Sequence, residues 1–278
     1  MKNNRIPLPT LGQDMLSEQT SLPSGAVRVA RNVDIGRDGT FGRRAGFVER
    51  VAGDAFHSIY YAAQKGWLLV CQGRTLYRMN PDTLALTSLF TLNSEDPLSY
   101  TEFNGEIYFT NPSTIGWIPS DSVLARTAGV VVPPAPIATA TTVGGLVAGE
   151  YGVSITLVDD RGEESGASEA TTVVLPVPGG ILLSGLPVIS NHRVYVYVTP
   201  PDGDQLYFTT DFVADAATAV ISISPGGATI DTQFLRPMLP GQFVRGFNGR
   251  LYTGYRDRLA FSEPFRPRAC SLRHGWIA

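Results

Sequence analysis

The chain has 278 residues, 43% of them hydrophobic and 17% charged, and a formal net charge of −3 at pH 7. This composition excludes an intrinsically disordered chain, and the length suffices for one large or two ordinary domains with a sizeable core. Glycine and proline are abundant, with 29 and 20 residues, and long helical periodicities are absent, so we expect an all-β protein with many turns.

Charge is distributed unevenly along the chain. Residues 130–235 hold eleven acidic and two basic residues, a net charge of −9, whereas the rest of the chain carries 20 basic and 14 acidic residues. The asymmetry predicts two modules that face different partners. Twenty of the 22 basic residues are arginine, which favours bidentate contacts to carboxylate or phosphate; compositional drift of a high-GC coding sequence would produce the same bias.

The sequence contains few signs of an active site. His57, His192 and His274 lie in three separate regions, and Cys71 and Cys270 are expected to be buried small side chains. No phosphate loop, nucleophile elbow, zinc motif or repeated glycosidase box occurs, so we expect a non-catalytic protein without a cofactor or metal. Paired carboxylates at residues 159–160 and 163–164 would suit calcium, but a solvated polar turn is the favoured interpretation.

In chain order, residues 1–24 read as an extended arm, because three prolines interrupt them and their leucines lack periodicity. A short helix over 13–19 is conceivable. We expect the arm to lie on a neighbouring surface, since its leucines would otherwise be exposed. The next element is a hairpin of two runs, 27–35 and 40–47, joined by an Asp38-Gly39 turn. Its flanking arginines include Arg28, Arg31, Arg37, Arg43 and Arg44.

Further hairpins follow, and one of them recurs. Phe-Asn-Gly-Glu-Ile-Tyr at 103–108 matches Phe-Asn-Gly-Arg-Leu-Tyr at 247–252, with a looser copy at 71–77. The pairs Asn104-Gly105 and Asn248-Gly249 are strong signals for tight turns between strands. Repeated strand pairs of this kind are typical of β-propeller blades. We therefore assign residues 25–129 and 236–278 to the first and last parts of one propeller-like domain.

Residues 130–235 interrupt that domain. A stiff proline-rich linker opens the segment, and about seven runs with alternating polar and apolar residues follow, as in half-buried sandwich strands. The stretch 151–165 resembles a fibronectin type III strand and its turn, with Tyr151 opening the strand and a Gly-Glu-Glu-Ser turn closing it. The expected fold is all-β, an incomplete β-propeller-like body of repeated hairpins interrupted by a fibronectin type III-like β-sandwich.

Eight more arginines lie between residues 236 and 273, among them Arg256, Arg258 and Arg268. If the propeller closes, its first and last blades are neighbours, and the two arginine groups meet. They could form ion pairs between subunits of a ring or line a passage for nucleic-acid phosphates. Ordinary surface arginines whose stems cover apolar strands are the plain alternative.

The chain resembles tailed-bacteriophage virion proteins of the tail-nozzle and head-to-tail stabilisation kind. The resemblance rests on Leu-Pro-Ser-Gly at 22–25, Ala-Arg-Asn-Val-Asp-Ile at 30–35, Arg-Arg-Ala-Gly-Phe at 43–47, the repeat at 247–252, and Leu-Ala-Phe-Ser-Glu-Pro at 259–264. It implies a structural protein of the virion tail, made in the host cytoplasm. Its expected partners are copies of itself in a symmetric ring, other tail or portal-proximal proteins, and transiently phage DNA in a lumen. Such proteins usually continue with further blades, so other chains could complete this propeller.

Two function classes therefore remain. In the first, the protein forms a ring in a phage tail, and the arginines named above face a neighbouring subunit or the lumen. In the second, it is a carbohydrate- or receptor-binding protein that uses aromatic residues such as Trp67, Trp117 and Tyr255.

Overall fold

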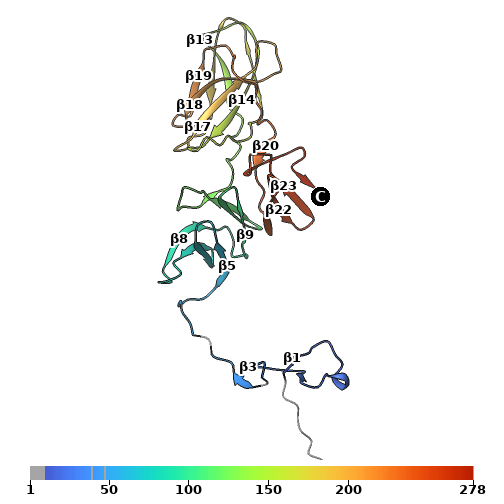
Figure 1. Cartoon of the computed structure of the whole chain (residues 1–278). Coiled ribbons are helices and arrows are strands. Elements are labelled where there is room, and N and C mark those ends of the chain that lie inside the picture. Colours follow the sequence, from blue (N-terminus) through green and yellow to red (C-terminus); the bar gives the residue numbers. More distant parts are fainter. Residues whose placement is uncertain (1–9, 39, 47, 278) are drawn as a thin grey trace, which may run out of the picture. The chain divides into compact units, whose positions relative to one another are not determined.

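The computed structural model describes residues 10–38, 40–46 and 48–277 (Figure 1). This part of the chain is all-β, with many short strands in small, mostly antiparallel sheets and a single 3₁₀ turn, as the composition predicts. None of its helices is long and apolar enough to cross a membrane. The chain divides into two compact units, residues 1–52 and 53–278, and each is described by itself.

The first unit contains two small sheets. Strand β1 (Gly12–Gln13) pairs in parallel with β2 (Ala26–Val27), and β3 (Val33–Ile35) pairs antiparallel with β4 (Phe41–Arg43). The predicted run over 27–35 is broken, because Asn32 takes a left-handed conformation with φ 57°. The conceivable helix over 13–19 does not form; Asp14 instead accepts hydrogen bonds from Leu16 and Ser17 in a local turn, and the 3₁₀ turn η1 covers Gln19–Ser21.

The second unit contains three four-stranded antiparallel sheets (Figure 1). Within each sheet, the strands lie side by side in the order in which they occur in the sequence. The first sheet contains β5 (Phe56–Ala62), β6 (Trp67–Gln72), β7 (Thr75–Met79) and β8 (Leu86–Thr91). The middle sheet contains β9 (Ser99–Phe103), β10 (Glu106–Asn111), β11 (Thr114–Ile118) and β12 (Arg126–Thr127). The last sheet contains β21 (Phe243–Phe247), β22 (Arg250–Tyr255), β23 (Arg258–Phe261) and β25 (Trp276–Ile277).

The middle sheet is covered on both faces because side chains alternate along its strands. Ile107 and Phe109 of β10 enter a core shared with the first sheet, which includes Leu69 and Leu76. Tyr108, between them, enters a second core shared with the last sheet, which includes Val244 and Leu251 of that sheet. The three sheets therefore stack in the order first, middle, last.

Residues 130–235, called here the 130–235 segment, form seven strands in two sheets. Strands β13 (Ile137–Leu146), β16 (Gly179–Ser184) and β19 (Thr218–Ile221) make the three-stranded sheet. Strands β15 (Thr171–Leu175), β14 (Gly149–Val158), β17 (Arg193–Val198) and β18 (Tyr207–Val213) make the four-stranded one. Both sheets contribute to one apolar core, in which Ile155, Ile181 and Val196 are fully buried.

The segment leaves the middle sheet and returns to the last sheet at one place. Strand β20 (Leu235–Pro237) pairs with β24 (Ala269–Ser271), next to the last sheet. Gly129, which follows the middle sheet, has φ +82°, and a Cβ there would lie 2.9 Å from the Cα of Pro237 and 2.5 Å from the Arg268 carbonyl oxygen. Only glycine fits such a close approach between the outgoing and returning chain.

Candidate functional site

The predicted turn residues lie at strand connections. Asn104 and Gly105 join β9 to β10 with φ 52° and 79°, and Asn248 and Gly249 join β21 to β22 with φ 46° and 76°. Both pairs occupy the left-handed region that a two-residue hairpin turn requires. Asp38 follows β3 and accepts hydrogen bonds from the backbone and hydroxyl of Thr40, which hold the pKa of its carboxyl below the ordinary value. Gly39 lies outside the described residues.

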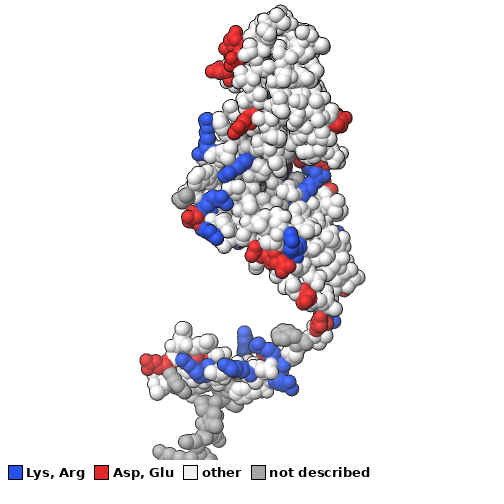
Figure 2. Space-filling model, turned by 180° about the vertical axis from the view of Figure 1, so that it is seen from behind, with Lys and Arg blue, Asp and Glu red and all other residues white. Residues whose placement is uncertain are grey.

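The five arginines singled out in the first unit are all exposed: Arg28, Arg31, Arg37, Arg43 and Arg44. Two of them have local partners, since Arg28 donates to the carbonyl of Ser17 and Arg44 pairs with Asp34 at 3.0 Å. The other three form no ion pair within the described part of the chain. Figure 2 shows several basic side chains on the surface of this unit. The side chains are thus accessible, and their predicted partners stay a prediction.

Arg256 and Arg258 lie at the connection between β22 and β23 in the second unit. Arg256 is exposed in the turn, and its guanidinium carbon lies 5.3 Å from the centre of the Tyr255 ring. Arg258 is half-buried in β23. The two predicted arginine groups belong to different compact units, so their meeting also stays a prediction.

Arg268 has intrachain partners that sequence reasoning did not identify. Its Nε donates to Glu163 at 2.5 Å, and its Nη1 lies 3.3 Å from Glu106, with all three side chains less than 20% exposed. The guanidinium also stacks on Trp117, 3.8 Å from the ring centre. Arg268, which comes just before β24, thereby connects the middle sheet to the 130–235 segment. Its charge is already balanced inside the chain, in contrast to the outward role that we predicted for it.

Three more arginine–carboxylate pairs cross the same boundary between the 130–235 segment and the stacked sheets. Arg126 pairs with Asp160, Arg161 with Asp121, and Arg266 with Asp231. In Figure 2 acidic and basic side chains lie close together around the middle of this unit, whereas the end of the segment at the top of the view carries acidic patches. Four ion pairs therefore hold this boundary, and the one through Arg268 is the most buried.

The Gly-Glu-Glu-Ser turn has a structural role, contrary to the solvated turn that we favoured. Glu163 binds Arg268, and Glu164 accepts hydrogen bonds from the hydroxyls of Thr156 and Tyr197 at 2.7 Å each. A Cβ on Gly166 would lie 1.7 Å from the carbonyl oxygen of Leu235, so the turn passes directly over β20. Its carboxylates serve as internal hydrogen-bond acceptors at the boundary.

Burial perturbs several ionisable groups at this boundary. Burial raises the pKa of Glu163, although the neighbouring Arg268 opposes that shift. Burial and the Glu106 carboxylate raise the pKa of Tyr108, whose hydroxyl donates to Glu106. Away from the boundary, burial raises the pKa of the Cys71 thiol to about 11. Glu163 also lines an open pocket of about 580 Å³ together with Trp117 and Arg126, whereas the Tyr108 and Cys71 side chains are fully buried.

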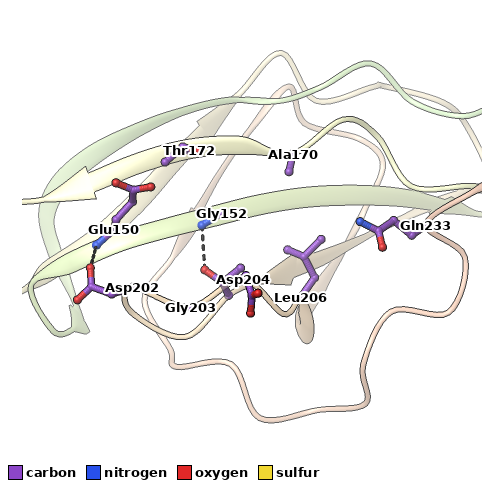
Figure 3. A pocket seen from close by; sticks show the side chains of 10 residues that line it. Glu150, Gly152, Ala170, Thr172, Asp202, Gly203, Asp204, Leu206 and Gln233 are labelled. Atoms are coloured by element: carbon purple, nitrogen blue, oxygen red, sulfur yellow. Dashed lines mark hydrogen bonds between the residues drawn. The ribbon is translucent and has the colours of Figure 1, made fainter.

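A pocket of about 740 Å³ lies beside β14 and carries three carboxylates, those of Glu150, Asp202 and Asp204 (Figure 3). Asp202 accepts from the backbone N–H of Glu150, and the Thr199 hydroxyl accepts from that of Gly152, each at 2.9 Å. These bonds attach the loop over 199–204 to the half of β14 that lacks β17. Within the residues described, no group of three or more His, Cys, Asp or Glu side chains is arranged to hold a metal ion.

The aromatic rings that the carbohydrate-binding alternative would use are largely covered. Trp117 is 2% exposed and belongs to the core between the middle and last sheets. The ring of Trp67 is covered by two cations, with the Lys65 Nζ 4.7 Å and the Arg78 guanidinium carbon 4.4 Å from its centre. Tyr255 is half-buried. A platform for sugar rings requires open aromatic faces, which these residues do not share.

The stack of sheets has two outer faces with exposed apolar side chains. On the first sheet, Ile59 is 69% and Tyr61 62% exposed. On the last sheet, Phe247 is 71%, Ile277 59% and Phe243 45% exposed. Several exposed large apolar side chains on one sheet face are consistent with an interaction surface.

No protein-family model matches this chain, and no curated protein matches it in sequence.

Proposed function

We propose that this protein is a structural, non-catalytic component of a bacteriophage tail, in a nozzle, a tail tip or a head-to-tail stabilising ring. It assembles with copies of itself and with other virion proteins. The observation that carries this proposal is the open-ended stack: three four-stranded sheets pack face to face, and the outer faces of the first and last sheets keep exposed aromatic and aliphatic side chains. Such faces suit continued assembly better than catalysis.

The same proposal assigns the sheets to two kinds of domain. The three sheets, which lie within residues 56–127 and 243–277, are taken as blades of an incomplete β-propeller, because each has four antiparallel strands and shares a core with its neighbour in the stack. The hairpin within 25–52, which the sequence assigned to the same propeller-like domain over 25–129 and 236–278, belongs to the first compact unit. The 130–235 segment is taken as a fibronectin type III-like sandwich, since a three-stranded and a four-stranded antiparallel sheet share one core. The arm predicted over residues 1–24 is proposed to contact a neighbouring surface; its residues 1–9 lie outside the described part of the chain.

The bacteriophage context rests on the sequence resemblance at residues 22–47 and 247–264. The exposed arginines of the first unit support contacts with a neighbouring subunit or with DNA phosphates in a lumen, because arginine suits both kinds of anion. Tail assembly places the protein in the virion, after synthesis in the host cytoplasm.

Electron microscopy of the purified protein and of virions, with proteomic identification of the chain in the virions, tests this proposal. We expect ring-shaped particles, and we expect the chain in the tail. Masses measured in solution at low and high salt test the contribution of the arginines, since ion pairs weaken with salt. A salt-insensitive monomer that binds glycans on an array, and that is absent from virions, would establish the carbohydrate-binding alternative instead.

A further inference from the structure

The repeated hexapeptide places the same aromatic pair on two successive sheets. Phe103 and Tyr108 of the middle sheet have ring centres 6.4 Å apart, with an interplanar angle of 64°. Phe247 and Tyr252 of the last sheet have ring centres 6.4 Å apart and an angle of 56°. The register agrees as well, because Phe103 lies opposite Glu106 and Phe247 lies opposite Arg250. The two pairs therefore occupy equivalent positions on equivalent sheet faces.

The surroundings of the two pairs differ. The last sheet covers the pair on the middle sheet, where Tyr108 is fully buried and Phe103 packs against the shared core. The Phe103 ring lies so close to β21 that a Cβ on Gly246 would be 2.4 Å from it. Across the described chain nothing covers the equivalent pair on the last sheet in this way, and Phe247 remains 71% exposed.

The middle sheet also holds the last sheet with hydroxyl groups. Ser99 and Thr101 of β9 accept hydrogen bonds from the backbone N–H groups of Val244 and Gly246, at 3.2 and 3.4 Å. These N–H groups are on the edge of β21 that β22 does not use, so the contact satisfies an otherwise free strand edge. Inside the chain, an antiparallel sheet with an apolar face therefore covers the equivalent face of the middle sheet. We expect a sheet of the same kind to cover the outer face of the last sheet.

The first sheet of this chain is antiparallel and has such an apolar outer face. The outer face of the first sheet exposes Ile59 and Tyr61 of β5, and by register it includes Leu68 and Tyr77. The outer face of the last sheet carries Arg245 and Arg250 and no carboxylate, whereas the outer face of the first sheet carries no charged side chain that would repel them.

We propose that the outer face of the last sheet binds the outer face of the first sheet of a second copy of this chain. The contact is head-to-tail, so each copy uses both faces, and repetition produces a closed ring or an open helical array. Its centre is the Phe247–Tyr252 pair, which takes the role that Phe103 and Tyr108 have inside the chain. This inference rests on the proposed function for self-assembly alone and does not depend on the phage context.

Sedimentation of the full chain and its variants tests the surface. Phe247→Asp is expected to weaken self-association at least tenfold, about the effect of losing one central aromatic contact. The matched control is Val174→Asp on β15, where the native side chain is 58% exposed in the 130–235 segment. Phe247→Ala serves as a second variant if the aspartate changes the circular dichroism spectrum. A monomeric wild-type protein, or equal association of wild type and both Phe247 variants, would overturn the proposal.

Disulfide trapping tests the pairing of faces, because the two native cysteines are buried. Phe247→Cys and Tyr61→Cys proteins, mixed and oxidised, are expected to give a covalent dimer that neither gives alone. A dimer from Phe247→Cys alone would indicate a symmetric contact and refute the head-to-tail arrangement, and no dimer from the mixture would refute the first sheet as the partner. Rings that persist in the Phe247 variants would refute this inference and leave the tail proposal standing; absence from virions would do the reverse.

Discussion

The guanidinium of Arg268 stacks on the indole of Trp117 at 3.8 Å while its Nε donates to Glu163. This contact joins three parts of the second unit: the middle sheet, the chain next to the last sheet and the 130–235 segment. The arrangement uses the planar, multidentate character of arginine, because one edge binds the carboxylates and one face packs on the aromatic ring.

We expect Arg268→Ala to lower the free energy of unfolding by about 3 kcal/mol, since it leaves Glu163 buried without its cation. Arg268→Lys should restore only part of this loss, because an ammonium cannot bind both carboxylates and stack on Trp117. The control is Arg193→Ala, whose pair with Asp211 is 48% and 31% exposed, and which should cost less than about 1 kcal/mol. Urea denaturation measures all three, and equal losses for Arg268→Ala and Arg193→Ala would contradict the assignment.

Glu163 should make stability depend on pH. Burial raises the pKa of Glu163 above its ordinary value of 4.5 in the folded state. The folded state therefore binds this proton more tightly, and the resulting stabilisation is present below pH 4.5 and lost as the pH rises through the raised pKa. Relative to Glu163→Gln, the wild type should therefore lose unfolding free energy as the pH rises from below 4.5 through the raised pKa of Glu163. Denaturation of both proteins across the pH range measures the difference, and parallel curves would refute it.

Gly166→Ala should disrupt the contact between the Gly-Glu-Glu-Ser turn and β20. The added Cβ would meet the Leu235 carbonyl oxygen at 1.7 Å, and backbone on both sides must shift to accommodate it. We expect a loss of about 3 kcal/mol or more in unfolding free energy. Gly226→Ala is the control, because its Cβ would meet no atom within 4 Å. If Gly166→Ala and Gly226→Ala have the same unfolding free energy in urea denaturation, the turn can move away from β20 without cost, and the prediction is wrong.

The two thiols should react slowly in the folded protein. Cys71 and Cys270 are both fully buried, and burial raises the pKa of Cys71 from 9.0 to about 11. A shift of that size lowers the thiolate fraction about a hundredfold, and burial also blocks access to the reagent. Iodoacetamide at pH 8 should therefore label both cysteines after denaturation and neither at a comparable rate before it. Fast labelling of the native protein would indicate an opening near β6 or β24.

The features that depend only on residues close together in the sequence were predicted correctly. The all-β class follows from composition, and the Asn-Gly pairs at 104–105 and 248–249 lie in turns because asparagine and glycine tolerate positive φ. The hexapeptide repeat was likewise visible without a structure. Even here a local rule was insufficient at Asn32, whose left-handed conformation interrupts a run that looks like one continuous strand.

Features that depend on residues far apart in the chain were not predicted. Arg268 resembles Arg256 and Arg258 in sequence, yet only Arg268 meets a carboxylate 105 positions away. The carboxylates at 163–164 likewise looked like a solvated turn, because their partners come from β14, β17 and the chain before β24. The glycine at 166 was the available signal: between paired carboxylates and a strand, it indicates close approach of another backbone.

The proximity of Gly129 and Pro237 has a consequence for how such a chain can change. Because the chain departs and returns at adjacent points, two crossovers in the gene, one on each side of this segment, could exchange it for any other module whose ends lie equally close. The stacked sheets would keep their cores, since Ala128 and Met238 on either side of the gap both belong to the same one. Replacing the 130–235 segment by a short glycine linker would create a minimal scaffold onto which other domains could be grafted.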